Sequence, residues 1–324
     1  MNLFKAKSLV AVMLCASISA AFTSAALAQD DVAKLNDEFD NEATANQWRR
    51  VEQVEGWNNN QLEIFDINKI YPGQCAMMPY TSSWYQDWRG VLLFKPIKGD
   101  FVITTKVKVT GRDGVSAPKS RFSLAGLMIR APRNITPQTW QPGGENYVFV
   151  SLGASLNPGV YSFEYKTTRN SKSDLKFGET NVNEAQLQIA RIGATTILAV
   201  KPAQGPWRVL GRFDRPDLPE ELQAGMTAYT DWPGVEKVPP RQHNATVIRG
   251  GNPDLGALYD YVRFARPRVP QELQGRNLAS ANEVSDAELL RFLGDAATGT
   301  GGNNAPTAVP GFATGAAATG AAKQ

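Results

Sequence analysis

Two stretches decide the fold of this chain: residues 101–109, which read FVITTKVKV, and residues 123–130, which read SLAGLMIR. In the first, Val102, Thr104, Lys106 and Lys108 alternate with Phe, Ile, Thr and Val at the odd positions. A period of two places successive side chains on opposite faces of a strand, and β-branched and aromatic residues favour strands. Both stretches are therefore predicted to be β-strands.

Similar short runs continue on both sides of these two, and Gly, Pro, Asn or Asp separates them. They are residues 62–65, 90–94, 147–152, 161–167, 187–191, 196–201, 225–230 and 258–265. No convincing long amphipathic helix lies between the runs, as alternating βα units would require. The pattern indicates an all-β fold, an antiparallel jelly-roll β-sandwich.

The composition is that of a folded soluble protein, because 42% of the residues are hydrophobic and 20% are charged. The net charge is +3, and Lys5 and Lys7 near the N-terminus account for most of it. The remaining chain is almost neutral, which argues against a nucleic-acid partner. One His and two Cys exclude the usual zinc sites and most catalytic triads. The single His243 follows a Pro-rich stretch, so we expect it in a surface loop.

The N-terminus has the form of a secretory signal peptide, residues 1–28. Lys5 and Lys7 precede an apolar segment, residues 9–21, and Ala26-Leu27-Ala28 matches the small-x-small cleavage pattern. The apolar segment is shorter than the roughly 20 residues that cross a bilayer. We therefore expect a periplasmic or secreted bacterial protein without a membrane span after cleavage.

Composition divides the rest of the chain into three regions. Residues 30–267 hold the strand-like runs, residues 268–293 are predicted to form a linker and a short helix, and residues 294–324 form an Ala/Gly/Thr-rich tail. Ser285 and Glu288 have the spacing of a capping box, so we expect a helix that ends by Gly294. That helix either packs on the edge of the sandwich or docks a partner. The tail contains too little apolar surface to fold and is predicted to be disordered.

A series of short motifs resembles the concanavalin A-like lectin/glucanase superfamily. The similarity is greatest to secreted modules of uncharacterised function related to the C-terminal domain of family 43 β-xylosidases. The motifs are, in order, Asp37-Glu38-Phe39-Asp40, Ser83-Trp84-Tyr85, Lys98-Gly99-Asp100-Phe101, Ala125-Gly126-Leu127-Met128-Ile129-Arg130, Glu145-Asn146-Tyr147-Val148, Ala190-Arg191-Ile192-Gly193 and Tyr259-Asp260-Tyr261-Val262-Arg263-Phe264. The resemblance implies two curved antiparallel sheets and a sugar-related role on the concave face.

Two groups of residues are candidates for binding a saccharide. Trp84, Tyr85 and Trp88 crowd one loop with Asp87. Aromatic rings stack on the apolar faces of sugars, and charged neighbours orient the hydroxyl groups. The alternative is that these rings only cap the core.

The second group depends on how two strands are placed. Arg130 ends one predicted strand, and Glu164 and Lys166 share the polar face of another. If the two strands lie near each other, these three side chains line one groove. The alternative is a solvated outer face with an ion pair worth at most about 1 kcal/mol.

A structural calcium ion is a candidate cofactor. The resemblance places the first and last strands side by side, which would bring Asp37, Asp40 and Asp260 together. Calcium takes six to eight oxygen ligands, which carboxylates and backbone carbonyls supply. The alternative is that these are ordinary solvated charges at strand ends.

Three functions from different classes remain open on the sequence. The first is an exported carbohydrate-binding or cell-envelope-associated module, with an oligo- or polysaccharide as partner. The second is a glycoside hydrolase or polysaccharide lyase that uses a groove carboxylate, such as Glu164 with Glu145 or Asp231. The third is a non-catalytic protein-interaction module. A pair of carboxyl groups about 5–9 Å apart in one groove would favour hydrolysis.

Overall fold

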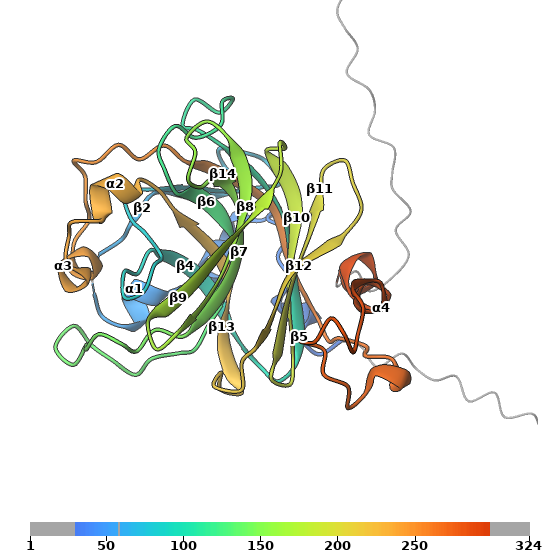
Figure 1. Ribbon diagram of the computed structural model, residues 1–324. Coiled ribbons are helices and arrows are strands. Elements are labelled where there is room, and N and C mark those ends of the chain that lie inside the picture. The colour runs from blue at the N-terminus through green and yellow to red at the C-terminus, as the bar shows by residue number, and fades with distance from the viewer. Residues whose placement is uncertain (1–29, 58, 299–324) are drawn as a thin grey trace, which may run out of the picture.

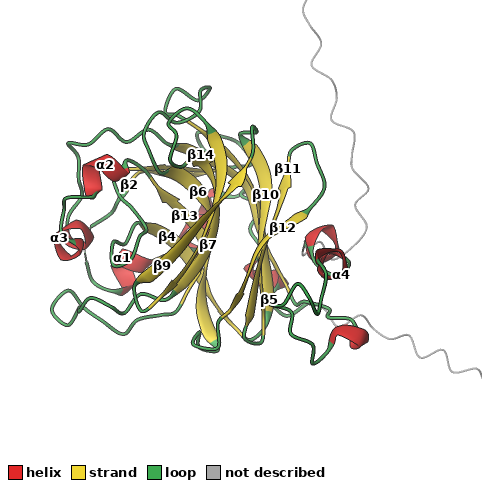
Figure 2. Ribbon diagram, in the orientation of Figure 1, coloured by secondary structure: helices red, strands yellow, loops and turns green. Residues whose placement is uncertain are grey.

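Two antiparallel β-sheets make up most of the protein. The computed structural model describes residues 30–57 and 59–298, and within them each sheet has seven strands. The prediction of an all-β jelly-roll sandwich is thereby confirmed (Figures 1 and 2). The predicted signal peptide and residues 299–324 of the predicted tail lie outside the described residues.

The strands of each sheet follow in spatial order. Sheet 1 consists of β1 (Arg49–Arg50), β4 (Val91–Lys98), β13 (Glu221–Tyr229), β6 (Ser123–Arg130), β7 (Tyr147–Ala154), β8 (Tyr161–Arg169) and β9 (Lys172–Glu179). Sheet 2 consists of β12 (Arg208–Asp214), β11 (Thr195–Pro202), β10 (Glu184–Ile192), β5 (Phe101–Thr110), β14 (Gly256–Ala265), β3 (Cys75–Pro79) and β2 (Leu62–Ile67).

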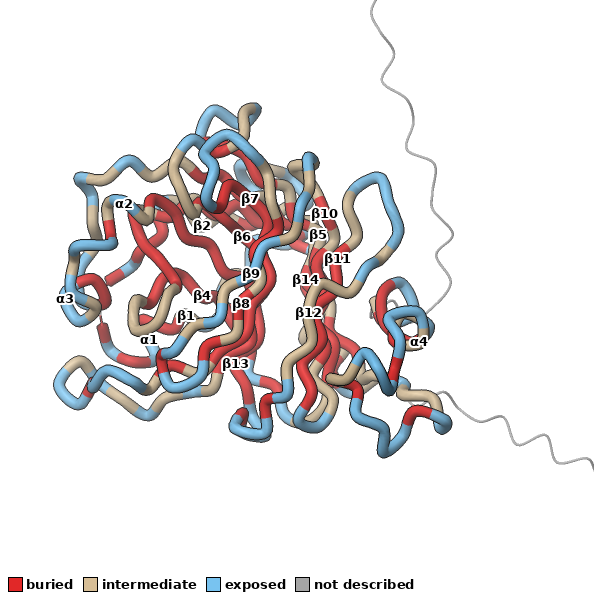
Figure 3. The backbone as a smooth tube through the Cα atoms, viewed as in Figure 1, coloured by how far each residue is buried: buried red, intermediate tan, exposed pale blue. Residues whose placement is uncertain are grey.

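The main core lies between the two sheets. Figure 3 shows buried residues along the strands on both sides of it. Period-two alternation explains it, because Ile103, Val107 and Val109 of β5 face Leu127 and Ile129 of β6 in one apolar cluster. The other face of β6 carries Leu124 and Met128, which belong to a second cluster outside sheet 1. Both faces of β6 are therefore buried.

Short helices cover the outer faces of the two sheets. α1 (Val51–Val54), α2 (Trp232–Val235) and α3 (Pro240–Ala245) lie on the side of sheet 1, and α4 (Asp286–Leu290) lies on the side of sheet 2 (Figure 1). The remaining helical turns are 3₁₀ turns at Ala33–Leu35, Glu42–Gln47, Gln271–Leu273 and Gly294–Ala297. No helix among the described residues is long and apolar enough to cross a membrane.

In the C-terminal segment the expected capping box forms, because the Ser285 hydroxyl accepts from the Glu288 backbone and the Glu288 side chain accepts from the Ser285 backbone. The helix ends at Leu290, before Gly294. Two other details differ from the prediction. Leu289 and Phe292 pack with Val102 and Ile197 on the outer face of sheet 2 rather than on its edge. The predicted tail begins too early, since residues 294–297 form a turn in which Ala297 is buried.

Candidate functional site

The outer face of sheet 1 is covered rather than open. Trp84, Tyr147, Phe149 and Tyr229 form an aromatic cluster there, together with apolar residues of β4 and β6. Trp84 is fully buried, its indole N–H donates to the carbonyl of Val91 at 2.9 Å, and its ring meets Tyr147 edge-on at 5.3 Å. Trp84 is thus the part of the predicted aromatic loop that caps a core.

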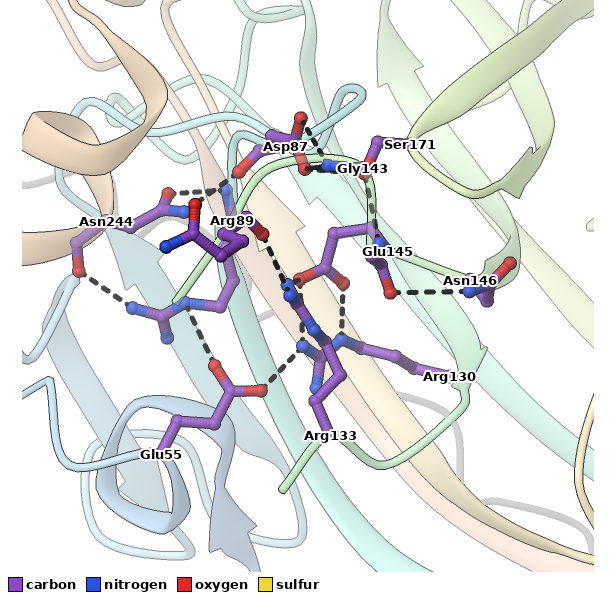
Figure 4. Close-up of polar contacts among 12 residues, drawn as sticks. Glu55, Asp87, Arg89, Arg130, Arg133, Gly143, Glu145, Asn146, Ser171 and Asn244 are labelled. Carbon is purple, nitrogen blue, oxygen red and sulfur yellow. Dashed lines mark hydrogen bonds and ion pairs between the residues drawn. The ribbon is translucent and has the colours of Figure 1, made fainter. Parts of the chain in front are cut away.

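A network of ion pairs holds the loops over this face (Figure 4). The Arg130 guanidinium donates to Glu55 at 2.6 Å, to both oxygens of Glu145 at 2.8 and 3.0 Å, and to Gln223 at 2.8 Å. Arg133 donates to the same Glu145 carboxylate at 2.7 Å. These contacts join α1, β6, β13 and the segment before β7.

Arg130 is therefore not available to a ligand, contrary to the groove that the sequence suggested. Its side chain is 0% exposed, and the carboxylates of Glu55 and Glu145 are its ionic partners. Burial alone would raise the pKa of Glu145, but Arg130 and Arg133 outweigh it and hold that pKa at about 2. Glu145 remains an ionised structural group at physiological pH, so it cannot serve as a general acid.

Asn244 and His243 of α3 secure the loop that carries the predicted aromatic residues. Arg89 donates to the carbonyl of Asn244 at 2.9 Å, and the backbone N–H of Ser83 donates to Nε2 of His243 at 3.3 Å. His243 is fully buried, which corrects the expectation of a surface histidine. Its Nδ1 lies 3.0 Å from the Asn244 amide oxygen, so Nδ1 carries the proton and the ring is neutral.

Asp87 also has a structural role in this loop. Its carboxylate accepts from the backbone N–H of Gly143 at 2.9 Å and from the Ser171 hydroxyl at 2.5 Å (Figure 4). The turn from Tyr85 to Trp88 is closed by backbone hydrogen bonds in both directions. This turn carries the rings of Tyr85 and Trp88. The hydrogen bonds of Asp87 therefore connect it to the segments before β7 and β9.

Glu164 and Lys166 of β8 lie on the same outer face, as predicted, but both are buried. The Lys166 ammonium donates to the carbonyl of Trp84 at 2.7 Å and lies 3.3 Å from Oε1 of Glu164. The Tyr229 hydroxyl donates to that same oxygen at 3.1 Å. Burial raises the pKa of Glu164 and lowers that of Lys166, because each charged form has lost its water.

A cavity of about 220 Å³ opens above Lys166. Its walls are mostly aromatic and apolar, with a few polar groups. The lining residues are Ser83, Trp84, Tyr85, Phe122, Lys166, Leu175, Tyr229 and Trp232. Tyr85 meets Trp232 at 5.5 Å, and Trp88 meets Trp232 at 5.7 Å, both nearly edge-on. Tyr85, Trp88 and Trp232 are each half-buried, so part of each ring faces solvent.

Strained backbone surrounds this cavity. Phe122 in its wall has a φ of 54°, Gln86 next to Tyr85 has a φ of 50°, and Asp231 next to Trp232 has a φ of 66°. Such left-handed conformations are costly for residues other than glycine, and they concentrate at functional sites.

The sequence identified Trp84, Tyr85 and Lys166 of this cavity and missed Trp232, Phe122, Tyr229 and Leu175. Trp232 lies two positions after the end of the predicted strand at residues 225–230 and precedes Pro233 and Gly234. An aromatic residue in such a turn was the available signal. Leu175 carried none, because half of the residues of its strand, β9, are charged, and such a sequence does not indicate a strand.

The carboxylates required for hydrolysis do not meet in the cavity. Glu164 pairs with Lys166 but does not itself line the cavity, and Glu145 belongs to the Arg130 network. Asp231 accepts from the Thr81 hydroxyl and the Asn252 backbone N–H, both at 2.7 Å. The described residues that line the cavity include no carboxylate. The arrangement thus lacks the pair that a glycosidase uses.

The structure does not bring the predicted calcium ligands together. Within residues 30–57 and 59–298, no group of three or more His, Cys, Asp or Glu side chains could hold a metal ion. The Asp37 carboxylate accepts from the indole N–H of Trp48 at 2.8 Å, and Asp260 pairs with Lys106 at 2.7 Å. Asp40 is exposed at the turn before the Glu42–Gln47 helix. These charges already have protein partners or face solvent.

Comparisons with known proteins give structural neighbours only. No protein-family model matches the chain. No curated protein sequence matches it. One similar solved structure is a functionally unknown protein from Saccharomyces cerevisiae, with 13% identity, a TM-score of 0.47, and coverage of 68% of this chain and 97% of that one.

The other neighbours include a glycosidase-family protein and a lectin. The GH43 BlXynB protein from Bacillus licheniformis has 12% identity and a TM-score of 0.48, and the match covers 71% of this chain but only 39% of that one. Lectin I-B4 from Griffonia simplicifolia has 12% identity and a TM-score of 0.43, with coverage of 71% and 98%. These are the two kinds of protein that the sequence resemblance named, and likenesses at this level assign neither ligand nor activity.

Proposed function

We propose that this protein is an exported, non-catalytic carbohydrate-binding protein whose ligand enters the cavity beside Tyr85, Phe122 and Trp232. The observation that carries the proposal is the composition of that cavity: its lining contains several aromatic side chains and a few polar groups. Saccharides present apolar C–H faces to aromatic rings and hydroxyl groups to fixed donors and acceptors.

The size of the cavity limits the ligand. At about 220 Å³ it is smaller than the roughly 300–1,000 Å³ typical of sites for drug-sized molecules. A single sugar ring, or the end of a longer chain, suits it better than a polysaccharide bound along its length. The partly exposed rings of Trp88 and Trp232 extend the apolar surface outside the cavity.

The proposal of export rests on the N-terminal signal pattern. The proposal of a non-catalytic role rests on the described residues that line the cavity, which include no carboxylate pair. A glycan-array screen of the purified protein tests binding. Hits should lose retention when Trp232→Ala removes one wall, whereas Trp207→Ala is the matched control, because Trp207 donates to Asp295 in the C-terminal segment.

The same hits test catalysis. Each is incubated with the protein at micromolar concentration, and new reducing ends and unsaturated products are measured. Unchanged glycans support a binding function. Product that accumulates with time would refute it, and failure of all glycans to bind would refute the saccharide site itself.

A further inference from the structure

Lys166 is the one charged side chain among the described residues that line the cavity. Its side chain is only 2% exposed. The ammonium lies 5.2 Å from the centre of the Tyr85 ring and 4.7 Å from that of Phe149, so aromatic faces rather than water surround it. An ammonium has three N–H donors, and the Trp84 carbonyl and Glu164 account for two of them. One donor remains for a ligand in the cavity.

Glu164 is a poor counter-ion for this lysine. The separation of 3.3 Å is longer than the 2.6 and 2.8 Å of the Arg130 pairs on the same face. The second oxygen of Glu164, Oε2, is buried and has no hydrogen-bond partner among the described residues. Unpaired buried carboxylate oxygens are costly, and protonation of the carboxyl group relieves that cost.

The titratable groups around Glu164 come from three strands. They are Lys166 on its own strand, Tyr229 on β13 and Tyr147 on β7. Burial raises the pKa of both tyrosines, so neither carries charge near neutral pH. Of the titratable groups around Glu164, only Glu164 itself and Lys166 therefore decide the local charge.

Building on the proposed saccharide site, we propose that its natural ligand is an acidic sugar, whose carboxylate pairs with Lys166 while Glu164 takes up one proton. The ligand carboxylate replaces Glu164 as counter-ion of an ammonium group whose side chain is only 2% exposed. Charge-assisted hydrogen bonds are short and strong in such surroundings. The proton taken up by Glu164 removes the repulsion between the two carboxylates, and no other group needs to change its charge.

Proton uptake gives the binding a defined dependence on pH. The affinity for the acidic sugar falls by up to about tenfold for each unit by which the pH rises. This holds over the range in which Glu164 is ionised in the free protein and protonated in the complex. Below that range Glu164 is already protonated and the affinity levels off. A neutral sugar binds without proton exchange at Glu164, so its affinity stays flat through the same range.

Matched sugar pairs test the proposal by isothermal titration calorimetry on the full chain. The pairs are glucuronate with glucose, galacturonate with galactose, and mannuronate with mannose. We expect at least one uronate to bind tenfold or more tightly than its neutral partner at pH 6. The preference should shrink by pH 8.5, and titration in buffers of different ionisation enthalpy should show uptake of close to one proton.

Three variants separate the roles of the residues. Glu164→Gln removes the titrating group and should abolish the pH dependence, with tighter binding of the uronate at pH 8. Lys166→Met should abolish the preference for the acid. Lys108→Met, the same change on β5 of sheet 2, should keep it. If Lys166→Met fails to fold, the Glu164→Gln variant and the wild-type pairs still decide the question.

The outcomes of the two proposals are distinguishable. Neutral sugars that bind as tightly as uronates, or a uronate affinity that does not vary with pH, would overturn the acidic-sugar proposal and leave the saccharide site standing. Failure of both members of every pair, together with a blank glycan array, would overturn both.

Discussion

Acidification is the perturbation to which His243 should respond most clearly. The imidazole is fully buried, Nε2 accepts the Ser83 N–H, and Nδ1 donates to Asn244. Burial lowers the pKa of His243 to about 4, the hydrogen bond to Asn244 opposes that effect, and the positive charge of Arg89 adds to it. A protonated Nε2 could no longer accept the Ser83 N–H, so the loop that precedes Trp84 and Tyr85 would lose a contact.

The magnitude follows from the difference between the unfolded and folded states. The unfolded imidazole has a pKa of about 6.5 and the folded one of about 4, a difference worth roughly 3–4 kcal/mol at about 1.4 kcal/mol per pH unit. Between these values the unfolded chain binds a proton that the folded protein does not. The free energy of unfolding therefore falls as pH drops from about 6.5 to about 4, and the contribution is fully present above pH 6.5.

Two buried carboxyl groups act in the opposite direction over part of this range. Burial raises the pKa of Glu52 and of Glu164. Each carboxyl group therefore keeps its proton in the folded protein up to a higher pH than in the unfolded chain. Their contribution to stability grows as pH falls. The comparison must therefore be made against His243→Gln, in which both carboxyl groups remain.

Urea unfolding at pH 7, 6, 5 and 4.5 measures the effect. The free energy of unfolding of the wild type should fall more steeply than that of His243→Gln, with the two curves converging near pH 4. The sequence has one His, so an untagged sample gives a single imidazole signal in proton NMR. A folded imidazole that titrates near 6.5, or parallel stability curves for the two proteins, would refute the reasoning.

Three further outcomes test the fold and the site. Arg130→Leu should cost about 3–5 kcal/mol in urea unfolding, because it leaves Glu55 and Glu145 buried without their ionic partner, and a loss under 1 kcal/mol would contradict the network. Gly126→Ala should lower the free energy of unfolding by about 3 kcal/mol or abolish expression, because the added Cβ would meet the backbone of Val150 and Ser151, the latter at 2.7 Å. A variant that melts at the wild-type temperature would contradict this packing. EDTA should leave the melting temperature unchanged, since the described acidic residues form no metal-binding group, and a drop of several degrees would restore the calcium hypothesis.

The strand pattern was readable where the local sequence alternates. Residues 101–109 and 161–167 have one polar and one apolar face, and the structure makes them β5 and β8. Four strands were not readable for physical reasons. β1 has only two residues, and β3 reads CAMMP and has no β-branched residue. β9 reads KSDLKFGE, in which half of the residues are charged, and β12 contains a central glycine, Gly211. Pairing with neighbouring strands, rather than local preference, makes these segments extended.

The binding candidates divide in the same way. Tyr85 and Trp88 could be found because aromatic residues crowd one loop of the sequence. The burial of Arg130 could not, because Glu55 comes from a segment 75 residues away and Gln223 from one 93 residues away. An arginine at the end of a strand has the same local sequence whether solvent or a carboxylate faces it.

The sequence by itself determined that this protein is an all-β sandwich with a capped C-terminal helix, because period-two alternation and a capping box act between residues close in the chain. Only the tertiary structure decided which face is buried, which charges are paired and where the cavity lies. Those features arise when β13, β6, β7 and β8 follow one another in sheet 1. Lys166 of β8 and Tyr229 of β13 then lie around one space with Trp84 of the loop before β4. Burial and pairing depend on neighbours distant in sequence, and local patterns contain no information about them.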